Sequence, residues 1–214
     1  MIKGAIFDLD GTLLDSMSIW ENTGENYLRS LGKEPKENLK ETLKTFSLER
    51  SARYFIENYD VRFSIEEIIH GINKMIEDFY INTVTLKNGV YELLKTLNEH
   101  NIKMCVATVT DAHLADAALT RLGVRQYFCE IFSGYSKEEP YIYREAQKYL
   151  DIPKNQIIVF EDALYALKTA DKDNFITAGV YDAYEENQAE IKNIADIYIP
   201  DYSGYDITKE SVWK

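Results

Sequence analysis

Residues 6–16 read IFDLDGTLLDS, and this stretch decides the fold that we predict. It begins as an apolar run typical of a buried strand, carries Asp8 and Asp10 with one residue between them, and breaks at Gly11. Side chains two apart in a strand point the same way, so we expect both carboxylates to face one spot at the strand's carboxyl end. Open parallel sheets bind their ligands at that edge.

Paired like charges need an explanation. Two carboxylates about 4 Å apart repel by roughly 4 kcal/mol at an effective dielectric constant of about 20. A folded protein tolerates this repulsion if a cation lies between them or if one of them stays protonated. A calcium-binding loop is excluded, because it needs glycine at its sixth position, where Leu13 stands, and a helix before it. The pair therefore indicates a metal site or acid-base chemistry.

Length and composition limit the class of protein. The 214 residues fit one large domain or a core with a smaller insert. A formal net charge of -12 argues against a nucleic-acid partner, because phosphate backbones require clustered Lys and Arg. No apolar run approaches the ~18 residues of a membrane span, so we expect a soluble protein. Cys105 and Cys129 lack the spacing of a disulfide framework or zinc site, and we interpret both as core thiols in a reducing cytoplasm.

Strand-like and helix-like segments alternate in the second part of the chain, which predicts an α/β fold with a Rossmann-like parallel sheet. After the first strand, we expect strands at 102–107, 129–133, 157–160, 175–180 and 196–199. We expect helices near 89–99, 111–122, 140–150, 163–171 and 184–194, with Asp111 as a helix cap and Asn174 as a left-handed helix exit.

Residues 16–85 differ, because their apolar residues recur at helical spacing and no convincing strand is present. Ser64 and Glu67 form a capping-box pattern that opens one of the helices. We therefore predict a core formed by residues 1–15 and 86–214, with an all-helical insert at 16–85.

The FDLDGTLLDS stretch resembles the first motif of the haloacid dehalogenase-like (HAD) superfamily, in the branch whose helical cap is inserted directly after that motif. The resemblance covers almost the full chain. It implies a Mg²⁺-dependent enzyme that transfers phosphoryl groups. The later motifs support the resemblance because they follow in the order found in the family.

Those later motifs imply further site residues. In KMCVATVTD, Thr108 stands where the family has a hydroxyl that donates to a phosphate oxygen, and in SKEEPYIYREA, Lys137 matches the family's lysine although the surrounding pattern is degraded. In IIVFEDALYAL, Glu161 and Asp162 match an acidic pair. By resemblance, Asp8, Asp162 and the Asp10 backbone carbonyl hold Mg²⁺, with Glu161 bound directly or through water. The alternative is that the acidic pair merely caps a helix.

The resemblance also implies a mechanism. Asp8 attacks phosphorus and forms an aspartyl-phosphate, while Asp10 protonates the leaving oxygen and then activates water. Lys137, Thr108 and the backbone N–H groups from Leu9 to Gly11 hold the phosphate oxygens.

Three other functions are compatible with parts of this pattern. Mutases of the beta-phosphoglucomutase kind share this architecture, but Trp20 replaces their cap histidine, and Leu48 stands in the slot of their phosphate-gripping Arg, with Arg50 two residues on. Metal-free dehalogenation is disfavoured by Asp10 and the acidic pair. A non-catalytic interaction protein with a degenerate site remains open. We favour a phosphatase.

The expected partner is a small phosphorylated metabolite, because a helical cap excludes large polymers. Trp20 and Arg50 are candidate substrate contacts, although a Trp at helical spacing from Tyr27 is more often a core residue. We expect a cytoplasmic monomer or weak dimer that binds neither nucleic acid nor membrane.

Overall fold

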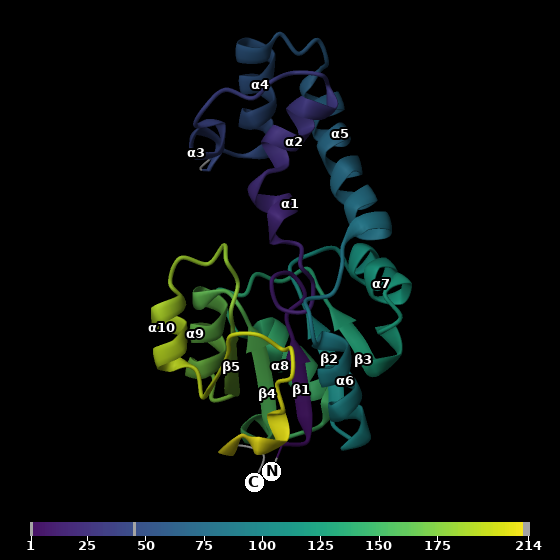
Figure 1. Ribbon diagram of the computed structural model, residues 1–214, viewed down its shortest axis with the longest axis vertical. Coiled ribbons are helices and arrows are strands. Elements are labelled where there is room, and N and C mark those ends of the chain that lie inside the picture. Colours follow the sequence, from purple (N-terminus) through teal and green to yellow (C-terminus); the bar gives the residue numbers. More distant parts are fainter. Residues whose placement is uncertain (1, 45, 212–214) are drawn as a thin grey trace. The chain divides into compact units, whose positions relative to one another are not determined.

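The computed structural model describes residues 2–44 and 46–211. The chain divides into two compact units, one formed by Met1–Ser16 with Val84–Lys214 and the other by Met17–Thr83. Within the described part of the chain, no helix is both long and apolar enough to cross a membrane. The two units are described separately below (Figure 1).

A six-stranded sheet forms the centre of the larger unit. Its strands are β1 (Gly4–Phe7), β2 (Lys103–Ala107), β3 (Phe128–Phe132), β4 (Ile157–Glu161), β5 (Ile176–Val180) and β6 (Ile197–Ile199). They lie in the order β3-β2-β1-β4-β5-β6, and every neighbouring pair is parallel. The predicted parallel α/β fold is thus confirmed. The strand order reverses between β1 and β4, and such a switch point is where open α/β sheets bind ligands.

Helices cover both faces of this sheet. They are α6 (Val90–Glu99), α7 (Ala112–Arg121), α8 (Tyr141–Leu150), α9 (Leu164–Lys172) and α10 (Gln188–Ile194), with short 3₁₀ turns η2 (Arg125–Tyr127), η3 (Lys154–Gln156) and η4 (Ile207–Lys209). Side chains of α8 and α9 pack with Ile6 and Val159 in one buried cluster, and α6 lies on the opposite side of the sheet from α8 (Figure 1).

The central strands explain why the sequence reveals them. Every residue of β1 and β4 is buried, and the Phe7 and Phe160 rings stack with centroids 4.2 Å apart. Strands buried on both faces read as continuous apolar runs rather than as alternating patterns. Two local predictions are also confirmed: Asp111 caps α7 by accepting the His113 N–H at 2.8 Å, and Asn174 has a φ of 64°.

The smaller unit is helical. It contains α1 (Met17–Glu21), α2 (Thr23–Ser30), α3 (Leu39–Leu43), α4 (Leu48–Tyr59), α5 (Ile65–Asp78) and the π-helical turn η1 (Phe79–Thr83). Its described residues include no strand. The predicted capping box opens α5, since Ser64 accepts the Glu67 N–H and the Glu67 carboxylate accepts the Ser64 N–H.

One prediction about the core is wrong. Cys105 is buried, and burial raises the pKa of its thiol to about 12, but Cys129 is exposed. Cys129 lies on β3, which is an edge strand of the sheet. The apolar run therefore predicted the strand correctly, but it did not predict which side chains of that strand are buried.

Candidate active site

Two adjacent strands deliver the acidic residues. Asp8 follows β1 directly, and its backbone N–H donates to the Phe160 carbonyl of β4 at 2.9 Å. Glu161 is the last residue of β4, and Asp162 follows it. The parallel pairing of β1 with β4 thus brings residues that are far apart in the sequence to the same edge of the sheet.

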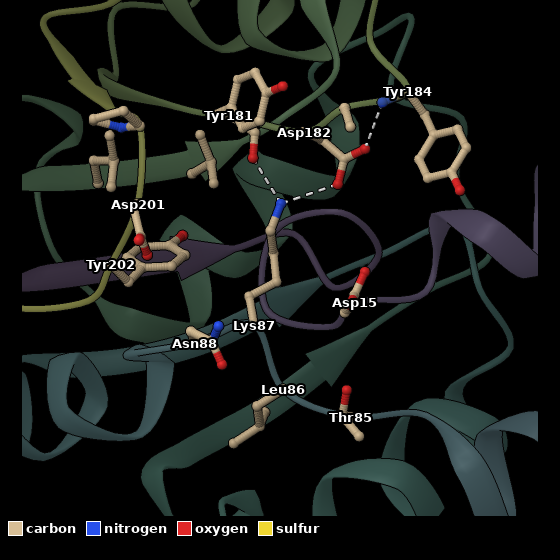
Figure 2. Close-up of a pocket in the computed structure, with 14 residues that line it drawn as sticks. Asp15, Thr85, Leu86, Lys87, Asn88, Tyr181, Asp182, Tyr184, Asp201 and Tyr202 are labelled. Atoms are coloured by element: carbon tan, nitrogen blue, oxygen red, sulfur yellow. Dashed lines mark hydrogen bonds and ion pairs between the residues drawn. The ribbon is translucent and has the colours of Figure 1, made fainter.

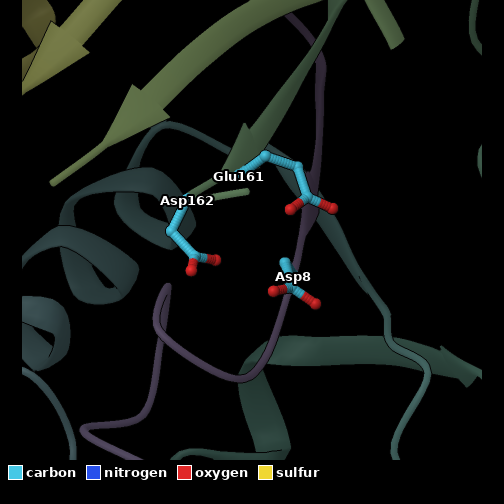
Figure 3. Close-up of side chains that lie close together, drawn as sticks. All are labelled: Asp8, Glu161 and Asp162. Atoms are coloured by element: carbon cyan, nitrogen blue, oxygen red, sulfur yellow. The ribbon is translucent and has the colours of Figure 1, made fainter. Parts of the chain in front are cut away.

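The carboxylates of Asp8, Glu161 and Asp162 form one buried group. Each offers an oxygen atom within 4.8 Å of those of the others. Figure 3 shows the three side chains turned toward a common space. Their exposed fractions are 7%, 0% and 4%, respectively. Water therefore screens their mutual repulsion poorly.

Lys137 supplies a positive charge to this group. It lies in the loop between β3 and α8, is 2% exposed, and donates to Asp8 and, at 2.5 Å, to Glu161. Burial alone lowers the pKa of Lys137, but the carboxylates of Asp8 and Glu161 outweigh this effect and raise it. The ammonium group therefore stays protonated at neutral pH.

One ammonium group does not balance three carboxylates. Burial, with the charge of Asp8 second, raises the pKa of Glu161 to about 7, and burial with Asp8 and Glu161 also raises the pKa of Asp162. Glu161 Oε1 accepts from Lys137 and from the Tyr143 hydroxyl at 2.7 Å, whereas its Oε2 is buried with no partner among the residues described. An orphaned buried oxygen in an acidic group fits a hard divalent cation such as Mg²⁺.

The helix-cap alternative for the acidic pair fails. Ala163 is the N-cap residue of α9, and no side-chain cap is found there. The Leu164 N–H is instead satisfied by Glu185 Oε2 at 3.1 Å. Asp162 Oδ1 accepts from the Thr12 hydroxyl at 2.9 Å. Asp162 is thus oriented by the loop that follows β1.

Asp10 occupies a different position from Asp8. Its carboxylate accepts from the Ser16 hydroxyl on Oδ1 and from the Thr110 hydroxyl on Oδ2, each at 2.6 Å. Asp10 is half-buried rather than fully buried. The first motif therefore presents one carboxylate to the acidic group and holds the second between two hydroxyl groups.

The residues predicted to bind phosphate follow β1 or β2 in the chain, and each makes different contacts. Thr108 follows β2, is fully buried, and its hydroxyl accepts the Thr110 N–H at 3.0 Å. Leu9 is fully buried. Gly11 has a φ of 73°, and its N–H already donates to the Leu14 carbonyl at 3.0 Å. The Gly11 amide is therefore engaged within its own loop.

Trp20 and Arg50 belong to the smaller unit. Trp20 is 42% exposed and donates from its indole nitrogen to the Tyr80 hydroxyl at 3.0 Å, so its interpretation as a core residue is wrong. The exposed Arg50 side chain lies over the Phe46 ring, 3.8 Å from its centroid.

Sequence reasoning missed the hydroxyl groups that orient the acids: those of Thr12, Ser16, Thr110 and Tyr143. Thr12 and Ser16 stand within the decisive stretch itself, and Thr110 lies two residues after Thr108. Tyr143, which lies within the SKEEPYIYREA stretch, is fully buried and donates to Glu161. Their position within or next to the motifs is the sequence signal that could have identified them.

Comparisons with known proteins agree with this geometry. The sequence profile of haloacid dehalogenase-like hydrolases matches residues 5–180. The phosphorylated carbohydrates phosphatase of Thermotoga maritima is 24% identical over 79% of this chain and 80% of its own length. The validoxylamine A 7'-phosphate phosphatase of Streptomyces hygroscopicus subsp. limoneus is 26% identical over 94% of each chain.

Solved structures show the same fold. A Thermotoga maritima protein placed among the beta-phosphoglucomutases has a TM-score of 0.81 and 22% identity, and the match covers 92% of this chain and 94% of that chain. The family profile spans both β1 with its acidic stretch and β4 with Glu161 and Asp162. The chain belongs to the haloacid dehalogenase-like hydrolase family.

Proposed function

We propose that this hydrolase is a Mg²⁺-dependent phosphatase that acts on a small phosphorylated metabolite through an aspartyl-phosphate on Asp8. The observation that carries the proposal is the buried contact between Asp8 and Lys137 beside Glu161 and Asp162. This arrangement combines a nucleophile, a fixed positive charge and an unbalanced acidic group. The names of the curated relatives support the phosphatase class.

Asp8, Glu161 and Asp162 are the side chains that would hold Mg²⁺, with the Asp10 carbonyl as a further ligand. Mg²⁺ prefers a few carboxylates together with water and substrate oxygens. When bound, it would offset the excess negative charge and polarise the phosphoryl group.

In the first step, a carboxylate oxygen of Asp8 attacks phosphorus and the bond to the leaving oxygen breaks. Asp10, in its protonated form, gives its proton to that oxygen, so the product leaves as an alcohol. Ser16 and Thr110 hold the Asp10 carboxyl group during this transfer.

In the second step, the Asp10 carboxylate takes a proton from water as the water oxygen attacks phosphorus. The bond between phosphorus and Asp8 breaks, which releases phosphate and restores the Asp8 carboxylate. Lys137 stays protonated and neutralises charge on the phosphoryl oxygens throughout both steps. Thr108 and the backbone N–H of Leu9 are the other proposed donors.

The substrate class follows from chemistry and relatives together. Two of the relatives are named for phosphorylated carbohydrates and for validoxylamine A 7'-phosphate, and on this support we propose a phosphorylated sugar or polyol. We also propose that residues 16–85 act as a cap over the site, with Trp20 and Arg50 as substrate contacts.

The first prediction tests this function. The purified protein with Mg²⁺ is offered a panel of phosphorylated sugars, polyols, organic acids and nucleotides, and phosphate release is measured. Asp8→Asn should abolish release because an amide is not a nucleophile, whereas Asp171→Asn, an exposed position on α9, should not change it.

Two outcomes would contradict the proposal. Conversion of glucose 1-phosphate to its 6-phosphate faster than any phosphate release would indicate a mutase. Absence of both activities across the panel would favour a non-catalytic protein.

A further inference from the structure

Lys87 makes an unusual set of contacts for a lysine outside the acidic group. Its ammonium nitrogen donates to the Gly11 carbonyl at 2.5 Å, to the Tyr181 carbonyl at 2.7 Å and to Asp182 Oδ2 at 3.0 Å. An ammonium group has three N–H donors, so these contacts use its full capacity. Figure 2 shows Lys87 reaching toward Tyr181 and Asp182 from the wall of a pocket.

The pocket has a volume of about 330 Å³ and lies where β5 and β6 end. Lys87 and Asp182 are largely buried in its wall, with side chains 18% and 6% exposed. The other Asp182 oxygen accepts the Tyr184 N–H at 2.9 Å, and the Tyr181 N–H donates to the Ile199 carbonyl at 2.9 Å. The acceptors of Lys87 on this side are therefore tied to the sheet.

On its other side, Lys87 meets the loop that carries Asp10. The backbone N–H of Lys87 donates to the Leu13 carbonyl, and the backbone N–H of Asp15 donates to the Thr85 carbonyl, each at 2.9 Å. A bridge between Leu14 and Leu86 lies between these two bonds. Residues 85–87 therefore run alongside residues 13–15, and both the backbone and the side chain of Lys87 hold this loop.

The loop in turn carries the groups that orient Asp10. Gly11 follows Asp10 directly and adopts a left-handed φ of 73°, and Ser16, at the end of the loop, donates to the Asp10 carboxylate. We propose that Lys87 is a positioning residue that, by bonding the Gly11 carbonyl to the end of β5, fixes Asp10 for proton transfer to the leaving group. This inference rests on the proposed phosphatase function.

A positioning role predicts a particular kinetic effect. A poor leaving group, such as an alkoxide, needs a proton from Asp10 as its bond breaks, whereas p-nitrophenolate leaves with little help. Asp10 also assists the later water step, which is common to both substrates, but kcat/KM reports only the steps up to departure of the leaving group. Displacement of Asp10 should therefore lower kcat/KM for alkyl phosphates far more than kcat/KM for p-nitrophenyl phosphate. General loss of folded protein would slow both by the same factor.

The variant Lys87→Met removes the ammonium group and keeps a side chain of similar length. Because it leaves Asp182 buried without its counter-charge, the double variant Lys87→Met with Asp182→Asn serves as a second test that avoids an unpaired charge. Lys95→Met is the matched control, since Lys95 is an exposed lysine on α6 that pairs only with an exposed glutamate in the described residues.

The first readout does not depend on activity. Amide hydrogen exchange in peptides that cover residues 9–16 should be faster in both Lys87 variants and unchanged in Lys95→Met. Unchanged exchange in the Lys87 variants would overturn the inference, whatever the enzyme's activity. Failure of the wild-type protein to release phosphate would instead overturn the proposed function.

The second readout compares substrates. In the Lys87 variants, kcat/KM for the best alkyl phosphate should fall at least about 10-fold, and kcat/KM for p-nitrophenyl phosphate less than about 3-fold. Lys87→Arg should restore part of the loss because it restores the positive charge. Equal losses of kcat/KM on both substrates would show that Lys87 is structural and would overturn the positioning role.

Discussion

The charge arrangement around Asp8 connects single residues to the proposed chemistry. Three buried carboxylates face one buried ammonium group, that of Lys137, and burial raises the pKa values of Glu161 and Asp162. Such raised values reflect the free energy of placing negative charge where water cannot stabilise it. A divalent cation would remove that penalty, which is why the acidic group supports a metal-dependent mechanism.

Sequence motifs predicted the charged residues of this site better than the hydroxyl groups that orient them. Asp8, Lys137 and Asp162 stand in recognisable patterns, and the structure brings Asp8 to both of the others. The partners of Thr12 and Thr110 could not be predicted, because Thr12 meets a residue 150 positions later and Thr110 meets one 100 positions earlier. Only the pairing of distant strands determines these partners.

Thr12 provides a second prediction. Its hydroxyl donates to Asp162, one of the proposed Mg²⁺ ligands. Loss of such a hydrogen-bond partner from a metal ligand typically costs about 10–100-fold in metal affinity or activity. Thr12→Val should therefore raise the Mg²⁺ concentration needed for half-maximal phosphate release by about this factor.

Thr120→Val, at an exposed position on α7, is the matched control and should leave the Mg²⁺ dependence unchanged. The same Mg²⁺ dependence in Thr12→Val and in the wild-type protein would contradict a role for this hydroxyl group.

The sequence predicted best those strands that are buried on both faces of the sheet. The strands next to β1, which are β2 and β4, each contain four consecutive buried apolar residues, so their positions could be inferred. The strand order β3-β2-β1-β4-β5-β6 could not be read from local patterns. Cys129 on the edge strand β3 shows the limit, because an edge position changes burial without changing the apolar pattern. The placement of Glu161 at the end of β4 beside β1 depends on that order.

Asp173 links three elements and gives a third prediction. It follows α9. Its carboxylate accepts two hydrogen bonds from Arg144 of α8 and forms an ion pair with Lys154 of η3. These contacts, that with Arg144 foremost, lower the pKa of the Asp173 carboxyl group. A lowered pKa stabilises the folded state above the ordinary carboxyl pKa of about 3.9, and this stability is lost as the pH falls through the lowered value.

Asp173→Asn should therefore reduce the free energy of unfolding at pH 7 by about 1–2 kcal/mol, measured by urea denaturation. The difference from the wild-type protein should shrink below about pH 4 and vanish at lower pH. A difference that stays constant between pH 7 and pH 3 would contradict the assignment. Asp171→Asn serves again as the exposed control.

The larger unit is built from both ends of the chain, since Met1–Ser16 joins Val84–Lys214 in one sheet. The acidic group combines Asp8 from the first segment with Glu161 and Asp162 from the second, so it exists only when the sheet has formed. The family and the parallel sheet were predictable because one specific stretch opens the chain and later motifs follow in order. The roles of Trp20 and Arg50 remain predictions.

A site that exists only in the folded state links metal binding to stability, and this gives a fourth prediction. Mg²⁺ at about 100 times its dissociation constant should stabilise the folded protein by about 2.7 kcal/mol. Thermal denaturation with Mg²⁺ and with a chelator should show this difference, and Asp162→Asn should lose most of it. An equal shift in the variant would mean that the ion binds elsewhere.

The central claim is that Asp8 carries the phosphoryl group during turnover, and rapid acid quenching of the working enzyme tests it most directly. After reduction with borohydride or digestion at low pH, mass spectrometry of the peptide that contains Asp8 reports whether an acyl phosphate formed there. In the wild-type protein we predict homoserine at position 8 after reduction and a phosphoryl group on Asp8 after digestion at low pH, and neither in Asp8→Asn. Steady release of phosphate with no adduct, or with an adduct on another residue, would contradict the account.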